Sequence, residues 1–249
     1  MYGFLVRPRW ILGHTLAAAG IILFLAAGIW QLNRLSDRIS NNEVIQARSA
    51  APVVDLSVAL RSVPAGSDPG AELEFRRVAV RGTYAPEHEI LVRSRSLAGQ
   101  AGYHVVTPLS YGDKAVLVNR GFVPQEFDEP PVGPALPPLG PVTVEGRIRA
   151  SVDPPRIGPR DPSEGHLDQV FWLNIDRIQS QVPLDLVPVT IELVAQTPEP
   201  GALPVVLPQP PLDEGPHRGY AIQWFSFAAI AAAGYFFLIR RAARRPGER

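Results

Sequence analysis

A short segment near the C-terminus combines side chains that can ligate a metal, pair with an anion and stack on a planar ring. The segment is "GPHRGYAIQW", and its candidate residues are His217, Arg218, Tyr220, Gln223 and Trp224. On a helix, His217, Tyr220 or Ala221, and Trp224 follow the i, i+3/i+4, i+7 spacing of one stripe. A neutral imidazole can coordinate a haem iron, while arginines suit its propionates and tryptophans its macrocycle. An ordinary histidine at a membrane surface is the alternative interpretation.

Two apolar runs must position these residues. Residues 10–30 read "WILGHTLAAAGIILFLAAGIW", and a second run covers residues 220–239. Each run is about 30 Å long as a helix, which matches the hydrocarbon core of a bilayer. A cleaved signal peptide is the alternative for the first run, but its apolar part exceeds the usual length of a signal segment. We therefore expect two transmembrane helices, at residues 10–32 and 220–239.

The exit of the first predicted helix carries further candidate residues, Trp30, Gln31 and Arg34. We expect Trp30 and Gln31 to lie at the same depth as Gln223 and Trp224, because both pairs mark the outer membrane boundary. Arg34 would then lie just above them and could meet a propionate. Aromatic belts and interhelical amide hydrogen bonds explain the same residues without a ligand.

The distribution of arginines predicts the orientation. Five arginines follow the second apolar run and only Arg218 immediately precedes it, which places the C-terminus in the cytoplasm. The expected order is a cytoplasmic N-terminus at 1–9, helix 10–32, an extracytoplasmic domain at 33–219, helix 220–239 and a basic cytoplasmic tail at 240–249. The expected location is a bacterial plasma membrane, with both termini cytoplasmic.

The region between the helices has β patterning. Seven short runs rich in β-branched residues alternate with turn signals, and proline-rich connections occur at 124–141 and 198–216. The chain after Trp30 is expected to remain helical until Pro52, and "NIDRIQSQV" to form one short helix. The predicted fold is a membrane α+β protein, in which two transmembrane helices flank an antiparallel β-barrel or sandwich of about seven strands.

Composition and motifs narrow the function. The chain has no cysteine, and its 24 basic and 24 acidic residues give zero net charge, which argues against a nucleic-acid partner. It contains no nucleotide-binding glycine loop, serine-hydrolase elbow or paired metal-binding histidines. Residues 161–168 could bind a cation, although a solvated loop is the simpler interpretation. We expect no enzyme activity; a membrane-tethered hydrolase would need a catalytic cluster assembled from distant residues.

Several residues of the β region suggest structural roles. Gly82, Gly102 and Gly121 are expected to serve turn geometry and packing rather than ligand contact. Arg120 is expected to pair internally with a carboxylate such as Glu145.

The chain resembles the surfeit locus protein 1 family of cytochrome c oxidase assembly factors. The matching segments are "GIWQLNRLSDRI", "FRRVAVRGTYAPEHEILVRSRSLAGQAGYHVVTPL", "VLVNRGFVP", "VTVEGRIR" and "GPHRGYAIQWFSFA". They occur in order along nearly the whole chain, and the third and last are the specific ones. Phe122 departs conservatively from the tryptophan that is common in the family. Residues 150–168 and the proline-rich stretches carry little resemblance.

The resemblance implies a membrane-anchored factor that helps mature the haem-bearing catalytic subunit of the oxidase. Bacterial members of the family resemble carriers of haem a, whose candidate iron ligand here is His217. The implied partners are cytochrome c oxidase subunits, haem a synthase and the lipid bilayer. A membrane scaffold that holds an assembly intermediate and never binds haem is the alternative.

Overall fold

A computed structural model describes residues 7–244 and divides the chain into two compact units. We call residues 1–44 with 211–249 the helix unit, and residues 45–210 the β-domain. Residues 1–6 of the expected cytoplasmic N-terminus, and residues 245–249 of the expected basic tail, lie outside the described residues. Each unit is described by itself.

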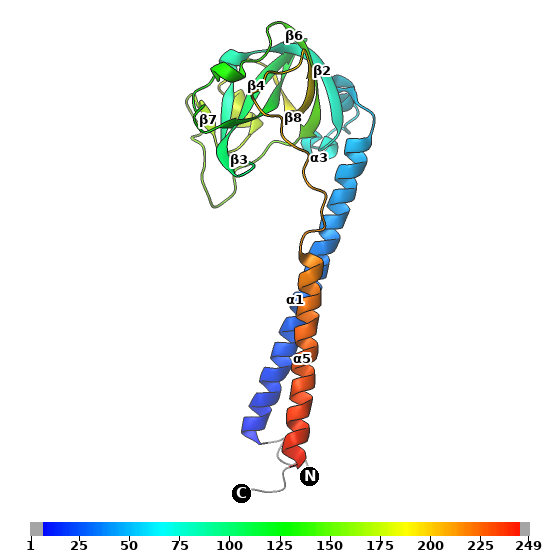
Figure 1. The fold of residues 1–249 in the computed structure, drawn as a ribbon. Coiled ribbons are helices and arrows are strands. Elements are labelled where there is room, and N and C mark those ends of the chain that lie inside the picture. Colours follow the sequence, from blue (N-terminus) through cyan, green and yellow to red (C-terminus); the bar gives the residue numbers. More distant parts are fainter. Residues whose placement is uncertain (1–6, 245–249) are drawn as a thin grey trace. The chain divides into compact units, whose positions relative to one another are not determined.

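The helix unit contains the two predicted apolar helices (Figure 1). Helix α1 is Pro8–Ala50 and helix α5 is His217–Arg244; α1 continues for its last residues into the β-domain. Pro8 occupies the first turn of α1, where its missing N–H costs nothing, and the helix ends just before Pro52, as predicted. Both helices are long and apolar enough to cross a membrane. The two helices are antiparallel. His14, early in α1, contacts Tyr235, late in α5, whereas Gln31, further along α1, contacts His217 at the start of α5.

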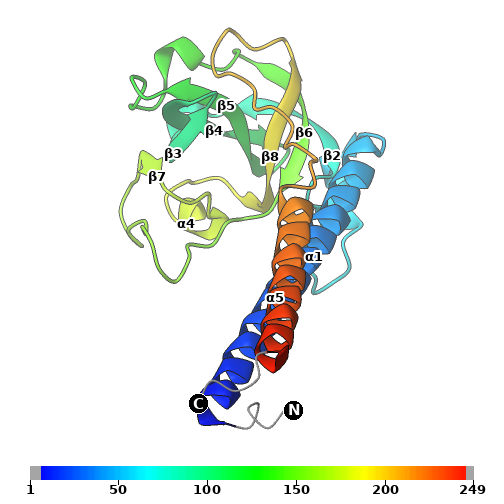
Figure 2. The same ribbon diagram turned by 60° about the horizontal axis from the view of Figure 1, so that its bottom comes forward.

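The β-domain is built on one eight-stranded sheet (Figures 1 and 2). Its strands are β1 Val54–Asp55, β2 Arg77–Tyr84, β3 Ile90–Leu97, β4 Gln100–Tyr111, β5 Lys114–Pro124, β6 Pro141–Arg149, β7 Gln169–Val170 and β8 Leu186–Thr197. Short helices are α2 Leu56–Arg61, α3 Pro69–Leu73 and α4 Ile175–Gln179, with single 3₁₀ turns at Pro86–His88 and Gly133–Ala135. Six of the seven predicted strands and the short helix α4 are present; of the predicted strand "QVFWLNI" only the first two residues form β7, and the two-residue β1 is an addition.

The prediction of a purely antiparallel sheet is wrong. The strand order is β1-β2-β6-β8-β5-β4-β3-β7, and β5–β8, β1–β2 and β3–β7 are parallel pairs. A parallel pair needs a long crossover, and residues 125–185 supply it between β5 and β8. Because β2 also pairs with β4, the strands β2, β6, β8, β5 and β4 form a closed circuit of hydrogen-bonded neighbours.

The core of the β-domain lies inside this circuit. Val78 and Val80 are buried, as their period-two spacing predicts, and pack with residues of β4, β5, β6 and β8. Gly82 marks the point where β2 leaves β6 and turns to β4. A Cβ added there would lie 2.3 Å from the Ser110 carbonyl oxygen, so the closure of the circuit requires a glycine.

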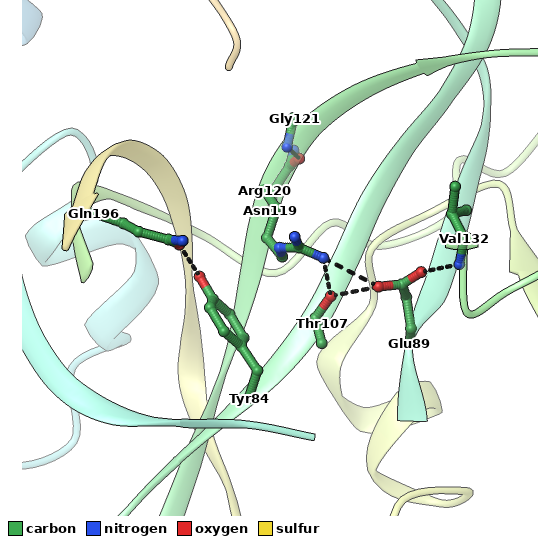
Figure 3. Close-up of polar contacts among 8 residues, drawn as sticks. All are labelled: Tyr84, Glu89, Thr107, Asn119, Arg120, Gly121, Val132 and Gln196. Atoms are coloured by element: carbon green, nitrogen blue, oxygen red, sulfur yellow. Dashed lines mark hydrogen bonds and ion pairs between the residues drawn. The ribbon is translucent and has the colours of Figure 1, made fainter. Parts of the chain in front are cut away.

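A buried ion pair crosses the β-domain between Arg120 and Glu89 (Figure 3). The nearest atoms are 3.3 Å apart, and the two side chains are only 2% and 0% exposed. Thr107 Oγ1 and the backbone N–H of Val132 also donate to the Glu89 carboxylate, at 2.9 and 2.8 Å. The suggested pairing of Arg120 with Glu145 is wrong, because Glu145 pairs with Arg77 instead.

A β-bulge explains why an arginine side chain points into the core. Val105 pairs with Gly121 and Val106 with Asn119, so Arg120 has no partner on β4. Such an extra residue re-aims its side chain relative to the regular alternation. The guanidinium lies 5.3 Å from the ring of Tyr84, whose hydroxyl donates to Gln196 at 3.0 Å. Burial raises the pKa of Tyr84 well above its ordinary value.

The polar loop at 161–168 has a structural explanation. The Asp161 carboxylate accepts hydrogen bonds from the backbone N–H groups of Phe171 and Trp172. His166 and Asp168 form an exposed pair at 3.2 Å. Within residues 7–244, no group of three or more histidine and acidic side chains is arranged to hold a metal ion.

Candidate cofactor site in the helix unit

The helix unit brings together two of the predicted site residues, His217 and Gln31. His217 is the first residue of α5, and its Nδ1 lies 2.9 Å from Oε1 of Gln31 on α1. Gln31 is buried, with 9% of its surface exposed, and His217 is half-buried. The contact joins residues 186 positions apart in the chain, so only the pairing of the two helices creates it.

The partner of Nδ1 determines what the other ring nitrogen can do. An amide oxygen accepts and does not donate, so the proton of the neutral imidazole is on Nδ1. Nε2 then keeps its lone pair and can coordinate a metal. Metal-binding histidines in general donate their other N–H to an oxygen acceptor, which orients the ring. The His217–Gln31 pair therefore has the arrangement that an axial ligand needs.

Gly215 precedes α5 and lies beside this nitrogen. Gly215 has a φ of +65°, and a Cβ added to it would lie 3.6 Å from Nε2 of His217. Its backbone N–H donates to the Asp213 carboxylate at 3.0 Å. A larger residue at 215 would be strained by this backbone conformation.

The segment around Asp213 is attached to α1 two to three turns beyond Gln31. The Asp213 carbonyl oxygen accepts hydrogen bonds from Arg38 Nε at 3.1 Å and from Asn42 Nδ2 at 2.9 Å. Arg38 also pairs with the Asp213 carboxylate at 3.4 Å. Gln31, Arg38 and Asn42 are spaced i, i+7 and i+11, so they share one face of α1. This face of α1 therefore holds the segment around Asp213, which leads into α5 and its first residue, His217.

Trp224 lies deeper in the helix pair than expected. Its ring stacks on Phe24, with centroids 5.9 Å apart, and meets Phe227 edge-on at 5.8 Å. Trp224 is seven residues beyond His217, which corresponds to about 10 Å along the helix. The expected common depth of the Trp30–Gln31 and Gln223–Trp224 pairs is therefore wrong. The antiparallel register places Gln31 level with His217 and Phe24 level with Trp224.

The remaining predicted residues form no side-chain hydrogen bond with His217 or Gln31 among the described residues. The Arg34 guanidinium lies over the Trp30 ring at 5.7 Å and pairs with Asp37 at 3.7 Å. Trp30 and Tyr220 are 53% and 49% exposed. Arg218 and Gln223 are also exposed, whereas Ala221 and Ala228 of the same helix are buried. The stripe of α5 that faces α1 thus contains His217, Ala221 and Trp224, and Tyr220 lies outside it.

Arg38, Asn42 and Phe24 shape this site but were not identified from the sequence. The spacing of Gln31, Arg38 and Asn42 carried a signal, because it is the heptad-like pattern of a helix face that meets a partner. Phe24 carried no special signal within an apolar run. A second polar pair, His14 and Tyr235, joins the helices at the opposite end of their apolar stretch. Interhelical bonds of this kind stabilise helix association by about 1 kcal/mol.

Comparison with known proteins points to a single family. The sequence profile described as the SURF1 family matches residues 18–229. An uncharacterised SURF1-like protein of Mycobacterium tuberculosis is 32% identical over 97% of this chain and 88% of its own length. A SURF1-like protein of Monosiga brevicollis is 28% identical over 92% of this chain and 88% of its own length. Surfeit locus protein 1 of Rattus norvegicus is 26% identical, with 91% and 76% covered. The chain therefore belongs to the SURF1 family.

Proposed function

We propose that this protein is a membrane-anchored assembly factor for haem-copper cytochrome c oxidase, which binds haem a and aids its insertion into the catalytic subunit. The SURF1 family, to which the chain belongs, is known as a family of cytochrome oxidase assembly factors. The observation that supports a haem site is the hydrogen bond from His217 Nδ1 to Gln31, which leaves Nε2 available. The protein would bind and release the cofactor without bond chemistry of its own.

In this proposal Nε2 of His217 would hold the iron of a bound haem. Gln31 orients the imidazole and keeps the proton on Nδ1. Arg34 and Arg218, both exposed near the site, would pair with the propionates. Trp30 and Tyr220, each about half exposed, would pack against the macrocycle. Gln223 and Trp224 belong to the deeper wall of the site, where Phe24 supports Trp224.

The proposed location follows from the arginine distribution. Both termini would be cytoplasmic in a bacterial plasma membrane, and the β-domain would lie outside. His217 then lies at the outer surface of the bilayer. The proposed partners are the haem-bearing oxidase subunit and other oxidase subunits, haem a synthase as donor, and the lipid bilayer.

The direct test is the visible spectrum of full-length protein purified from cells that make haem a. We expect a haem absorption band that is lost in His217→Ala, because the variant lacks the axial nitrogen. His14→Ala is the matched control: it removes the other histidine of the helix unit and should keep the band. Wild-type protein without haem, or a His217→Ala variant with the same band, would refute ligation by His217.

A scaffold without haem is the second candidate, because the His217–Gln31 bond can equally serve as a simple interhelical contact. It predicts that the oxidase subunit co-purifies with His217→Ala as with the wild type, and that the oxidase then has normal haem content. The haem-carrier proposal predicts the opposite for haem content, so one preparation distinguishes the two.

Gln31→Met provides a finer test of the orienting bond. Methionine keeps the length of the side chain and lacks the oxygen that accepts from Nδ1. We expect the haem affinity to fall about 10–100-fold, the usual effect of losing such an outer partner. Gln46→Met is the matched control, since Gln46 is exposed on a later turn of the same helix α1 and should tolerate the change. Titration of the apoprotein with haem measures both; equal affinities would show that Gln31 does not position the ligand.

A further inference from the structure

The β-domain contains a cavity of about 470 Å³ that the proposed function does not use. This volume is within the range of small-molecule sites. Its wall combines apolar side chains, Val92, Val152 and Leu173, with charged and polar ones. The polar members on the strands include Arg95 of β3, His104 of β4, Asn119 of β5 and Glu192 of β8, together with Arg149 of β6 and Thr190 of β8.

These polar residues form a row across neighbouring strands. Val92 is paired with His104, and Asn119 with Glu192, while Glu192 is paired in turn with Arg147. Paired residues project from the same face of a sheet. One face of β3, β4, β5 and β8 therefore presents a line of hydrogen-bonding groups to the cavity, where a purely structural face would be apolar.

Backbone geometry fixes the protonation of His104. The backbone N–H of Gly121 donates to Asn119 Oδ1 at 3.2 Å, so the amide nitrogen of Asn119 faces the imidazole. That nitrogen lies 3.3 Å from Nδ1 of His104 and donates to it. The ring proton is then on Nε2, which makes His104 a neutral donor. Burial, and secondarily the charge of Arg95, lowers the pKa of His104 to about 4, so the ring stays neutral near pH 7.

Two arginines around the cavity have carboxylate partners, and Arg95 has none among the described residues. Arg149 pairs with Glu74 at 3.6 Å, and Arg147 pairs with Glu192. Among residues 7–244, the half-buried Arg95 has no carboxylate within ion-pair distance. Its Nη2 donates a hydrogen bond to the Phe171 carbonyl oxygen at 3.2 Å. Most of the five N–H donors of this guanidinium remain available.

The remaining acid of the wall does not neutralise Arg95. Asp153 is exposed on the loop after β6, and its carboxylate accepts a hydrogen bond from Asn174 at 2.8 Å. Solvent screens the field of such an exposed charge. The cavity thus offers one unpaired cation and one neutral donor beside an apolar wall.

We propose that this cavity binds a small monocarboxylate, whose carboxylate is held by Arg95 and by Nε2–H of His104 and whose apolar part packs on Val92, Val152 and Leu173. Guanidinium and carboxylate match in charge and geometry. One negative charge matches Arg95, the arginine of the cavity wall without a carboxylate partner, whereas the second charge of a dianion would find no further unpaired arginine in that wall, because Arg149 is paired with Glu74. The site is independent of the proposed haem ligation.

Hexanoate is a suitable probe, with hexanamide and hexylammonium as analogues that remove or reverse its charge. The full-length protein, labelled with ¹⁵N-histidine in maltoside micelles, would be titrated with each compound. A His104→Gln spectrum assigns the signals of His104. We expect saturable shifts of these signals with hexanoate, at a Kd at least about tenfold below that of hexanamide, as a charge-assisted hydrogen bond implies. Hexylammonium should not bind.

Variants locate the contact. Arg95→Gln should weaken hexanoate binding about tenfold and leave hexanamide unchanged. Arg81→Gln, on an exposed position of β2, and His217→Ala should bind hexanoate like the wild type. The proposal is overturned if hexanoate and hexanamide bind equally, if His104 does not respond, or if Arg95→Gln binds hexanoate normally. The comparison of the three probes on the wild-type chain decides the matter even if a variant fails to fold.

Discussion

Replacing Arg120 by methionine is expected to lower the free energy of unfolding of the β-domain by about 3–5 kcal/mol. The reason is that the substitution leaves the Glu89 carboxylate buried without its cation. Glu89 is fully buried, and Arg120 is the cation that lies 3.3 Å from its carboxylate. A buried carboxylate without its cation carries a desolvation cost that the hydrogen bonds from Thr107 and Val132 offset only in part.

The loss should depend on pH, and the direction can be derived. Burial raises the pKa of Glu89, while the Val132 and Thr107 hydrogen bonds and the charge of Arg120 lower it. Removing Arg120 deletes one lowering influence, so the pKa of Glu89 rises further in the variant. The folded state then binds more protons than the unfolded chain above the unfolded pKa of about 4.3, and stability falls as pH rises. The variant should lose less stability at about pH 5 than at about pH 8.

A brief protease pulse in increasing urea can measure this on the full-length protein in detergent. Arg77→Met is the matched control, because the Arg77–Glu145 pair is partly exposed and should contribute at most about 1 kcal/mol. In the double variant Arg120→Met with Glu89→Gln, the charge is removed and an oxygen remains for the Val132 N–H. This variant should recover about 2 kcal/mol relative to Arg120→Met alone. Additive losses would show that the two charges do not interact.

The same region illustrates what the sequence could predict. Runs rich in β-branched residues predicted the six longer strands β2, β3, β4, β5, β6 and β8 and the position of the short β7, and period-two spacing predicted the buried Val78 and Val80 of β2. This patterning does not specify which strands are neighbours in the sheet, so it could not predict the parallel β5–β8 pair. The partner of Arg120 was wrong for a related reason: Glu89 reaches it only through the bulge at Arg120 and the closure of β2 onto β4.

The helix unit shows the corresponding limit for the candidate site. Helical spacing correctly predicted the stripe of His217, Ala221 and Trp224, since helix geometry alone determines it. The level at which α1 meets α5 depends on packing between two chain segments that are far apart in sequence. Gly28, for example, is buried where a Cβ would lie 2.8 Å from the Phe225 ring. Contacts of this kind set the register, and with it the pairing of His217 with Gln31.

Gly121→Ala is the second variant with a large expected effect, about 3–5 kcal/mol of the free energy of unfolding. Gly121 follows the bulged Arg120 and has a φ of +134°, a backbone conformation that residues with a side chain rarely adopt. A Cβ there would also lie 2.2 Å from the Val205 carbonyl oxygen. That oxygen accepts from the Phe122 N–H, and the Val205 N–H donates back to Phe122, both at 2.8 Å.

The added Cβ of Gly121→Ala therefore has two separate costs. It strains the backbone of the bulge, and it displaces the proline-rich segment that carries Val205. Gly140→Ala separates them. Gly140 has a φ of +82°, yet nothing lies within 4 Å of an added Cβ, so this control carries strain alone and should lose about 1–2 kcal/mol. Hydrogen exchange adds a local readout, since the amides of Phe122 and Val205 should exchange faster in Gly121→Ala than in Gly140→Ala at matched stability. If both variants lose the same free energy and protect these amides equally, contact with the proline-rich segment is not what requires glycine at position 121.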